Sequence, residues 1–356
     1  MSQPPHETEK VPTADVNAAL DQATALAQPS IAAAQEKINE PEAMAADQLY
    51  GTPPPAEAIW QETGALIEGT SLWRDAWRRW RKNKLAVIGG IIVILIVLAS
   101  LIGPVIIKAL TGYTYDLIPS DRTLVRAMPP SLMHLMGTDP QGRDVLARVL
   151  VGGRISLMVG LVSTAVSLVI GVSYGAVAGY LGGRIDNVMM RIVDVIYAVP
   201  LMIIVIVLLA LFEKSLFLLF AALGAVSWLT MARIVRGQIL SLKHQEFVEA
   251  ARSIGVPTWK IIYRHLIPNT LGPVIVYATL TVPSVILQEA FLSFLGLGVQ
   301  APLSSWGTLA SEGADNIAIF PWMIIFPGVT MALMLFSLNF VGDGLRDALD
   351  PHMRKV

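Results

Sequence analysis

Residues 85–107, LAVIGGIIVILIVLASLIGPVII, contain no Asp, Glu, Lys or Arg, and 16 of these 23 residues are Ile, Leu or Val. A helix needs about 20 such residues to cross the roughly 30 Å hydrocarbon core of a bilayer. Each of these aliphatic side chains favours insertion by about 0.3 to 0.6 kcal/mol at the helix centre. The stretch therefore predicts a membrane-spanning helix.

Five more runs lack the same four residue types and are long enough, or nearly so, to span a bilayer. They are residues 155–183, 195–212, 215–232, 265–288 and 316–342. The composition agrees, because only 15% of residues are charged, against about 25% in soluble domains. The absence of cysteine excludes a disulfide scaffold, thiolate metal sites and a Cys nucleophile. We therefore predict an all-α polytopic membrane protein with a six-span domain over residues 85–345.

The distribution of Lys and Arg predicts the orientation of these spans. With the N-terminus inside, the inner segments carry 19 basic residues and the outer segments carry 7. Basic residues are enriched in the cytoplasmic loops of membrane proteins. Both termini, including the tail of residues 346–356, are therefore expected in the cytoplasm.

The N-terminal part has a different composition. Residues 1–70 are rich in Ala and Pro and hold eleven acidic but only two basic residues, which predicts a disordered acidic cytoplasmic tail. Residues 71–84 place Trp73, Trp77 and Trp80 on one helical face among six Arg and Lys residues. This pattern predicts an interfacial amphipathic helix anchored to anionic membrane lipids. Nucleic-acid binding, the rival interpretation, is disfavoured by the adjacent membrane span.

Residues 246–269, EFVEAARSIGVPTWKIIYRHLIPN, predict a helix, a break and a second helix on the inner side. At helical spacing the first half has an apolar face of Phe247, Ala250, Ala251 and Ile254 and a charged face of Glu246, Glu249 and Arg252. Gly255 suits a left-handed helix end, and Pro268 is expected to close the second helix. Such a helix fits either a groove on a partner or the bilayer surface.

This segment resembles the EAA signature of the membrane subunits of ABC-type importers, through Glu249-Ala250-Ala251, Gly255 and residues 266–268 (LIP). The resemblance implies a type I importer permease fold in which residues 241–268 form the coupling segment between spans four and five. It also implies which residues contact the ATPase: Glu249, Ala250, Ala251, Gly255, Phe247 and Arg252.

Other motifs resemble the dipeptide/oligopeptide/nickel branch of these importers. They are residues 137–144 (GTDPQGRD), 292–298 (LSFLGLG) and 342–351 (GDGLRDALDP). Residues 153–160, 231–238 and 303–307 are most similar to the C-type permease subunit of oligopeptide importers. The resemblance covers nearly all of the chain beyond about residue 70.

The resemblance implies a bacterial inner-membrane location and a set of partners. These are a homologous B-type permease, two cytoplasmic ATPases that bind ATP and Mg, an extracytoplasmic peptide-binding protein, and a peptide substrate. The chain has no G-x-x-x-x-G-K-[S/T] phosphate loop, so we expect a transport subunit with no cofactor and no enzymatic activity of its own. Dipeptides, glutathione or nickel are alternative cargoes, and an ATP-independent secondary transporter or channel is the remaining alternative.

Several charged and polar residues in or near the predicted spans have their own expected roles. Asp139, Arg143 and Asp144 are expected to form ion pairs that hold an outer loop. Glu289 falls near the outer interface, where it either lines a substrate path or sits among lipid headgroups. The short inner turn is expected to contain local ion pairs of Asp186, Arg191 and Asp194. The five His are scattered, and no Ser/His/Asp arrangement is visible, so no metal or catalytic site is predicted.

Overall fold

The computed structural model describes residues 72–121, 125–212 and 215–349, and in these ranges the chain is helical without a named β-strand. The predicted acidic tail over residues 1–70 lies outside the described residues, as do residues 350–356 of the predicted C-terminal tail. The last helix runs to Leu349, four residues into that predicted tail.

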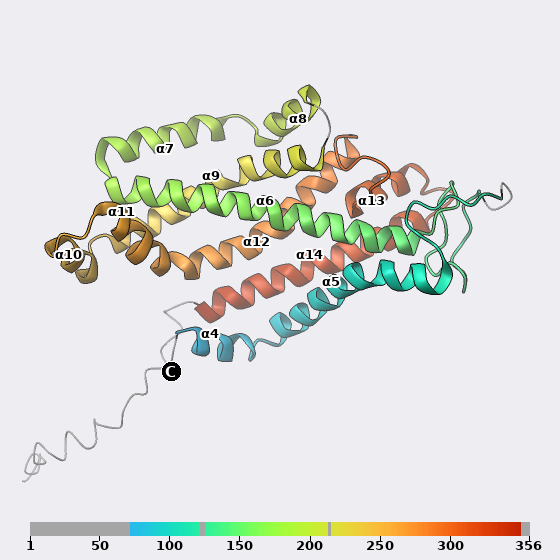
Figure 1. Ribbon diagram of the computed structural model, residues 1–356, viewed down its shortest axis with the longest axis horizontal. Helices are drawn as coiled ribbons and strands as arrows, with labels where there is room; N and C mark the ends of the chain where they lie inside the picture. Colours follow the sequence, from blue (N-terminus) through green and yellow to red (C-terminus); the bar gives the residue numbers. More distant parts are fainter. Residues whose placement is uncertain (1–71, 122–124, 213–214, 350–356) are drawn as a thin grey trace, which may run out of the picture. The chain divides into compact units, whose positions relative to one another are not determined.

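Most of the helices are joined by short connections, the main exception being residues 112–144 between the first two long helices, and Figure 1 shows the helices packed as a bundle. In chain order they are α4 (Leu72–Trp80), α5 (Lys84–Thr111), α6 (Val145–Leu181), α7 (Gly183–Ala198), α8 (Leu201–Leu211), α9 (Leu216–Leu242), α10 (Glu246–Ser253), α11 (Thr258–Lys260), the π-helix η1 (Ile261–Leu266), α12 (Ile267–Phe294), α13 (Trp306–Asp315) and α14 (Trp322–Leu349). Helices α5, α6, α9 and α14 and the continuous stretch Thr258–Phe294 are long and apolar enough to cross a membrane. Together with the bent pair α7–α8 they make six candidate spans.

The third span differs from the prediction. A span over residues 195–212 was predicted, but α7 begins at Gly183 and the chain bends by 76° between α7 and α8. The break lies at Val199 and Pro200, where both residues adopt non-helical backbone angles. Proline has no N–H to donate and disfavours helix in the residue before it. Helix α7 also contains charged residues, and two of them, Asp186 and Asp194, are paired with α9.

Three glycines bring α6 and α9 together. Gly171, Gly175 and Gly179 recur every four residues on α6, and each faces α9. A Cβ atom on Gly171 would lie 2.6 Å from Cβ of Met231, so no larger residue fits without movement. Small residues at this spacing allow membrane helices to pack closely. The α6–α9 pair therefore forms the centre of the bundle.

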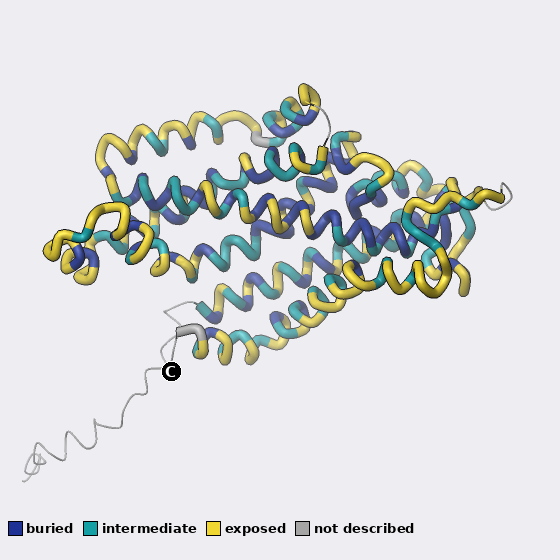
Figure 2. The backbone as a smooth tube through the Cα atoms, in the orientation of Figure 1, coloured by how far each residue is buried: buried dark blue, intermediate teal, exposed yellow. Residues whose placement is uncertain are grey.

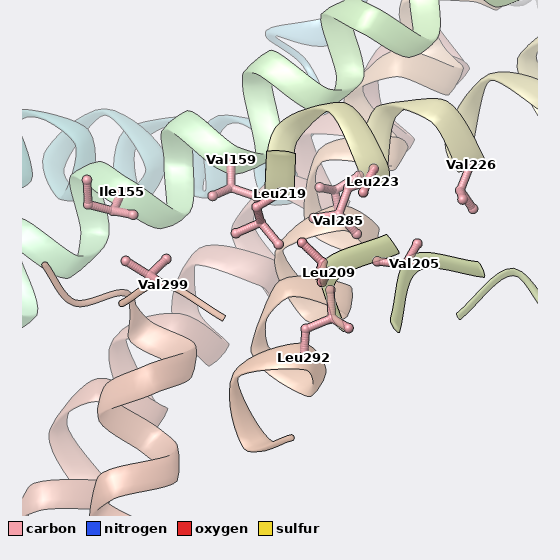
Figure 3. Close-up of a cluster of buried hydrophobic side chains, with 11 residues drawn as sticks. Ile155, Val159, Val205, Leu209, Leu219, Leu223, Val226, Val285, Leu292 and Val299 are labelled. Carbon is pink, nitrogen blue, oxygen red and sulfur yellow. The ribbon is translucent and has the colours of Figure 1, made fainter. Parts of the chain in front are cut away.

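The largest buried cluster extends this pair toward α8 and α12. Figure 3 shows Val159 of α6, Leu223 of α9, Leu209 of α8 and Val285 of α12 with their neighbours in this cluster. Helix α5 packs on the other side, against α14, where a Cβ on Gly89 would lie 2.8 Å from the carbonyl oxygen of Ser337. Away from α14, α5 exposes many large apolar side chains, among them Leu85, Ile88, Ile91, Ile94, Leu95 and Leu98. In Figure 2 α6 is mostly buried, whereas α5 and α7 are largely exposed.

Pro268 does not close a helix, in contrast to the prediction. The chain stays helical from Thr258 to Phe294 and widens to a π-helix in η1. There the backbone N–H of Ile267 donates to the carbonyl of Ile262, five residues earlier. Pro268 is the second residue of α12, which directly follows this π-helix. The fifth span therefore continues directly into the inner segment.

The functional elements lie at opposite ends of the bundle. Figure 1 places α4, α10 and α11 at one end, and α13 and the segment between α5 and α6 at the other. In the predicted orientation the first end is cytoplasmic and the second is extracytoplasmic.

Candidate coupling site

Helix α10 rests on a buried apolar base. Val248 is fully buried and Ala251 is 5% exposed, and both join a cluster with Ile261 and Leu266 of η1 and Val235 of α9. Since residues i and i+3 lie on one helical face, these two side chains fix which side of α10 faces its own chain. The base links α10 both to the fourth span and to the start of the fifth.

The opposite side of α10 is a free surface. Phe247, Ala250 and Ile254, which we call the coupling surface, are exposed, and Ile254 is 80% exposed. Glu249 is exposed beside it. The prediction that Ala251 shares this surface is wrong, because Ala251 is buried within its own chain. The second apolar face of α10, formed by Val248 and Ala251, was not predicted from the sequence.

Arg252 connects α10 to the end of α6. Its Nε donates a hydrogen bond of 3.2 Å to the hydroxyl of Tyr180, and its guanidinium lies 5.1 Å from the centre of the same ring. A cation over an aromatic face is attracted to it, and the hydrogen bond fixes the orientation. The side chain of Arg252 therefore binds a residue of its own chain.

Gly255 ends α10 with φ of +77°, the left-handed conformation that favours glycine. No atom of the described chain lies within 4 Å of the position that a Cβ would occupy. The backbone conformation, and not crowding within the chain, therefore explains the glycine. The turn allows Val256 to donate to the carbonyl of Ala251 at 3.0 Å.

Two ion pairs hold α7 against α9 near the same end. Arg236 donates from Nε and Nη2 to both carboxylate oxygens of Asp186, at 2.6 and 2.7 Å. Arg233 donates to Asp194 at 2.8 Å. The predicted local pairs of Asp186, Arg191 and Asp194 are therefore wrong, because the two carboxylates bind residues of α9. The partners lie 50 and 39 positions away in the sequence, so local spacing gave no signal.

A buried ion-pair network occupies the other end. Asp139 accepts from Arg143 at 2.7 Å and from Arg148 at 2.8 Å. Arg148, whose side chain is 4% exposed, also forms two hydrogen bonds with Glu312 of α13, at 2.7 and 3.0 Å. The network thus joins the outer loop, α6 and α13.

Asp144 binds the first turn of α6 and His134 of the loop. Its Oδ1 accepts from the backbone N–H of Ala147 at 2.8 Å and caps α6, while its Oδ2 lies 2.8 Å from Nδ1 of His134. A carboxylate at a helix N-terminus satisfies a free N–H and favours the helix dipole. Neither His134 nor the Arg148–Glu312 pair was predicted from the sequence.

Glu289 lies in neither of the two predicted environments. It is 0% exposed, and its Oε1 accepts from Ser293 at 2.7 Å and from Ser305 at 2.6 Å. Its Oε2 has no hydrogen-bond partner. Ser305 also caps α13 in a capping box with Thr308. Glu289 therefore ties α12 to the start of α13 and faces neither a path nor lipid within this chain.

The tryptophans of the predicted anchor are partly described. The backbone of Trp73 lies in α4, but its side chain lies outside the described part of the chain. Trp77 and Trp80 stack with ring centres 5.2 Å apart. Trp77 is exposed, whereas Trp80 contacts the positions of Gly90 and Gly344. Trp80 thus packs α4 onto α5 and α14.

Two family models match the chain. Residues 171–355, more than half of it, match the binding-protein-dependent transport system inner membrane component, and residues 71–130 match the N-terminal TM domain of oligopeptide transport permease C. The chain therefore belongs to the family of binding-protein-dependent transport system inner membrane components, which are permease subunits of ABC importers. It is an inner-membrane transport subunit of a kind that works with ATPase and binding-protein partners.

Among its relatives are permeases named for peptide transport. The chain is 50% identical to the oligopeptide transport system permease protein OppC of Haemophilus influenzae over 289 residues, covering 81% of this chain and 91% of that one. It is also 50% identical to OppC of Escherichia coli strain K12, covering 81% and 94%. The dipeptide transport system permease protein DppC of Bacillus subtilis is 44% identical, with 80% and 87% covered.

Proposed function

We propose that this permease subunit imports oligopeptides and that α10 is the helix through which ATP hydrolysis drives it. The cargo is supported by the two OppC relatives at 50% identity over more than nine-tenths of their length. The coupling role of α10 is supported by one structural observation. The coupling surface of Phe247, Ala250 and Ile254 is exposed and rests on a base of buried side chains. An apolar helix face held in place from behind is suited to a groove on a partner protein.

In this proposal both termini and α10 face the cytoplasm, where two ATPase subunits bind ATP and Mg. A homologous B-type permease forms the other half of the path, and an extracytoplasmic binding protein delivers the peptide. Closure of the two ATPases moves α10, and the motion passes to α6 through Arg252 and to α9 and α12 through the buried base. Membrane-embedded helices then switch between inward-open and outward-open arrangements.

A pull-down through the C-terminus in mild detergent, with mass spectrometry of the bound proteins, tests the composition of the complex. The expected partners are a second six-span permease and P-loop ATPases. A homo-oligomer without any ATPase would contradict the proposal and favour a secondary transporter or channel.

Coupling is tested in proteoliposomes that hold the purified complex. Glu249→Lys reverses a charge beside the coupling surface, and Gly255→Trp combines a bulky group with a strained φ. Both are expected to lower peptide uptake for each ATP hydrolysed, while the subunit stays inserted. Unchanged uptake and unchanged peptide-stimulated ATP hydrolysis in both variants would refute the assignment of α10.

Dipeptides are the second candidate cargo, because the DppC relative is 44% identical to this chain. Competition of labelled tetrapeptide uptake by unlabelled dipeptides separates the two. Weak competition by dipeptides supports oligopeptides, and strong competition supports dipeptides.

A further inference from the structure

A cavity of about 500 Å³ lies between α5, α6 and the segment that leads to α13. Its polar walls come from Lys108, Tyr113, Tyr115 and Arg154, and its apolar walls include Ile155. Pockets for small ligands have volumes of roughly 300 to 1,000 Å³ and combine apolar walls with a few polar groups. The cavity thus has the size and the mixed lining of a ligand site.

The cavity is positively charged. Two of its lining residues are basic, and none is acidic. Within the described part of the chain, neither Lys108 nor Arg154 forms an ion pair with a carboxylate. This contrasts with Arg143 and Arg148 of the same outer region, which both bind Asp139.

Arg154 is held in place but keeps a free donor. Its Nη2 donates to the carbonyl of Leu101 at 3.0 Å, which fixes the guanidinium against α5. Its Nε is buried and has no hydrogen-bond partner. A guanidinium forms charge-assisted hydrogen bonds with carboxylates, so Arg154 would attract an oxyanion that enters the cavity.

We propose that this cavity binds the terminal carboxylate of a peptide as the peptide leaves its binding protein. The proposal rests on the oligopeptide function proposed above. Lys108 and Arg154 supply the positive charge, and Tyr113 and Tyr115 supply hydroxyl donors and aromatic walls. The cavity lies at the outer end of the first two spans and borders Leu303, two residues before the capping residue Ser305 of α13. A bound carboxylate therefore contacts two spans and the α13 connection together.

Binding is measured by saturation-transfer NMR on the complete importer in nanodiscs without the binding protein. The probes are trialanine and trialanine amide, which differ only in the terminal carboxylate. The wild type is expected to bind the acid about tenfold more tightly than the amide, as one or two charge-assisted hydrogen bonds predict. Equal binding of acid and amide would overturn the proposal.

Two variants and a control test whether the preference for the acid over the amide arises in this cavity. Lys108→Gln and Arg154→Gln are expected to weaken binding of the acid about tenfold and to leave the amide unchanged. The side chain of Lys108 forms no ion pair within the described residues, so its variant keeps the fold even if Arg154→Gln loosens α5. Arg126→Gln removes an exposed cation outside the cavity and should leave both probes unaffected. Normal binding of the acid by the Lys108 and Arg154 variants would overturn the proposal.

Lipid phosphate is the other source of an oxyanion, and the nanodisc composition separates it. The measurement is repeated in phosphatidylcholine and with about one third phosphatidylglycerol. Loss of trialanine binding in the anionic bilayer would assign the cavity to lipid and overturn the peptide site. Absence of ATP-driven peptide uptake by the wild type in proteoliposomes would reject the proposed function itself, a result distinct from any of these.

Discussion

Replacing Ile254 with alanine separates the role of the coupling surface from the stability of the chain. Ile254 is 80% exposed at the end of α10, so its side chain contributes little to the packing of this subunit. If an ATPase covers it, the substitution removes three buried carbon atoms worth about 0.8 kcal/mol each. Scaled by the exposed fraction, the loss is about 2 kcal/mol, or roughly a 30-fold weaker affinity.

The assay compares binding of the purified ATPase to the permease pair in nanodiscs with the thermal stability of that pair. Ile254→Ala should weaken ATPase binding and leave the unfolding temperature unchanged. Val248→Ala is the matched control on the buried side of the same helix. It removes two methyl groups of a fully buried side chain, so it should lower the stability by about 2 kcal/mol. ATPase affinity that is unchanged in Ile254→Ala, or stability that falls as much as in Val248→Ala, would refute the reasoning.

Four further substitutions test the packing described above. Arg148→Met leaves Asp139 with a buried, partly compensated charge and should lower the free energy of unfolding in mixed micelles by about 3 kcal/mol; Arg143→Met, nearer the surface, should cost less, and equal losses would contradict the network. Glu289→Ala removes the acceptor of two serine hydroxyls and should cost about 2 kcal/mol and expose the start of α13 to proteolysis. Gly171→Leu should force α6 away from α9 and yield a subunit that aggregates on size-exclusion chromatography, whereas a monodisperse, active variant would show that the close contact is dispensable.

The membrane spans were predictable because each is a long local signal. A run such as residues 85–107 is committed to the bilayer by the sum of many small transfer energies, whatever its neighbours do. The EAA segment was predictable as a helix for a similar reason, since its spacing and Gly255 are both local. These features need no knowledge of tertiary contacts.

The predictions failed where contacts with residues distant in the sequence determine whether a side chain is buried or where a helix begins. Helix α10 has two apolar faces, and only the position of η1 determines that Ala251 is buried while Ile254 is exposed. Glu289 is buried because Ser305, on a segment 16 positions away, supplies a hydroxyl. Asp186 extends α7 because Arg236 of α9 neutralises it. In each case the deciding partner lies in another element, where sequence spacing carries no information.

Helix α6 gives the molecule one continuous mechanical element between its two ends. Its 37 residues extend over about 55 Å, more than the hydrocarbon thickness, and begin at the capping residue Asp144. In its first turn Arg148 binds α13, and in its last turn Tyr180 binds Arg252 of α10. A tilt imposed at one end of such a rod displaces the other end at the same moment. Communication between the two membrane faces therefore requires no relay of successive side-chain rearrangements.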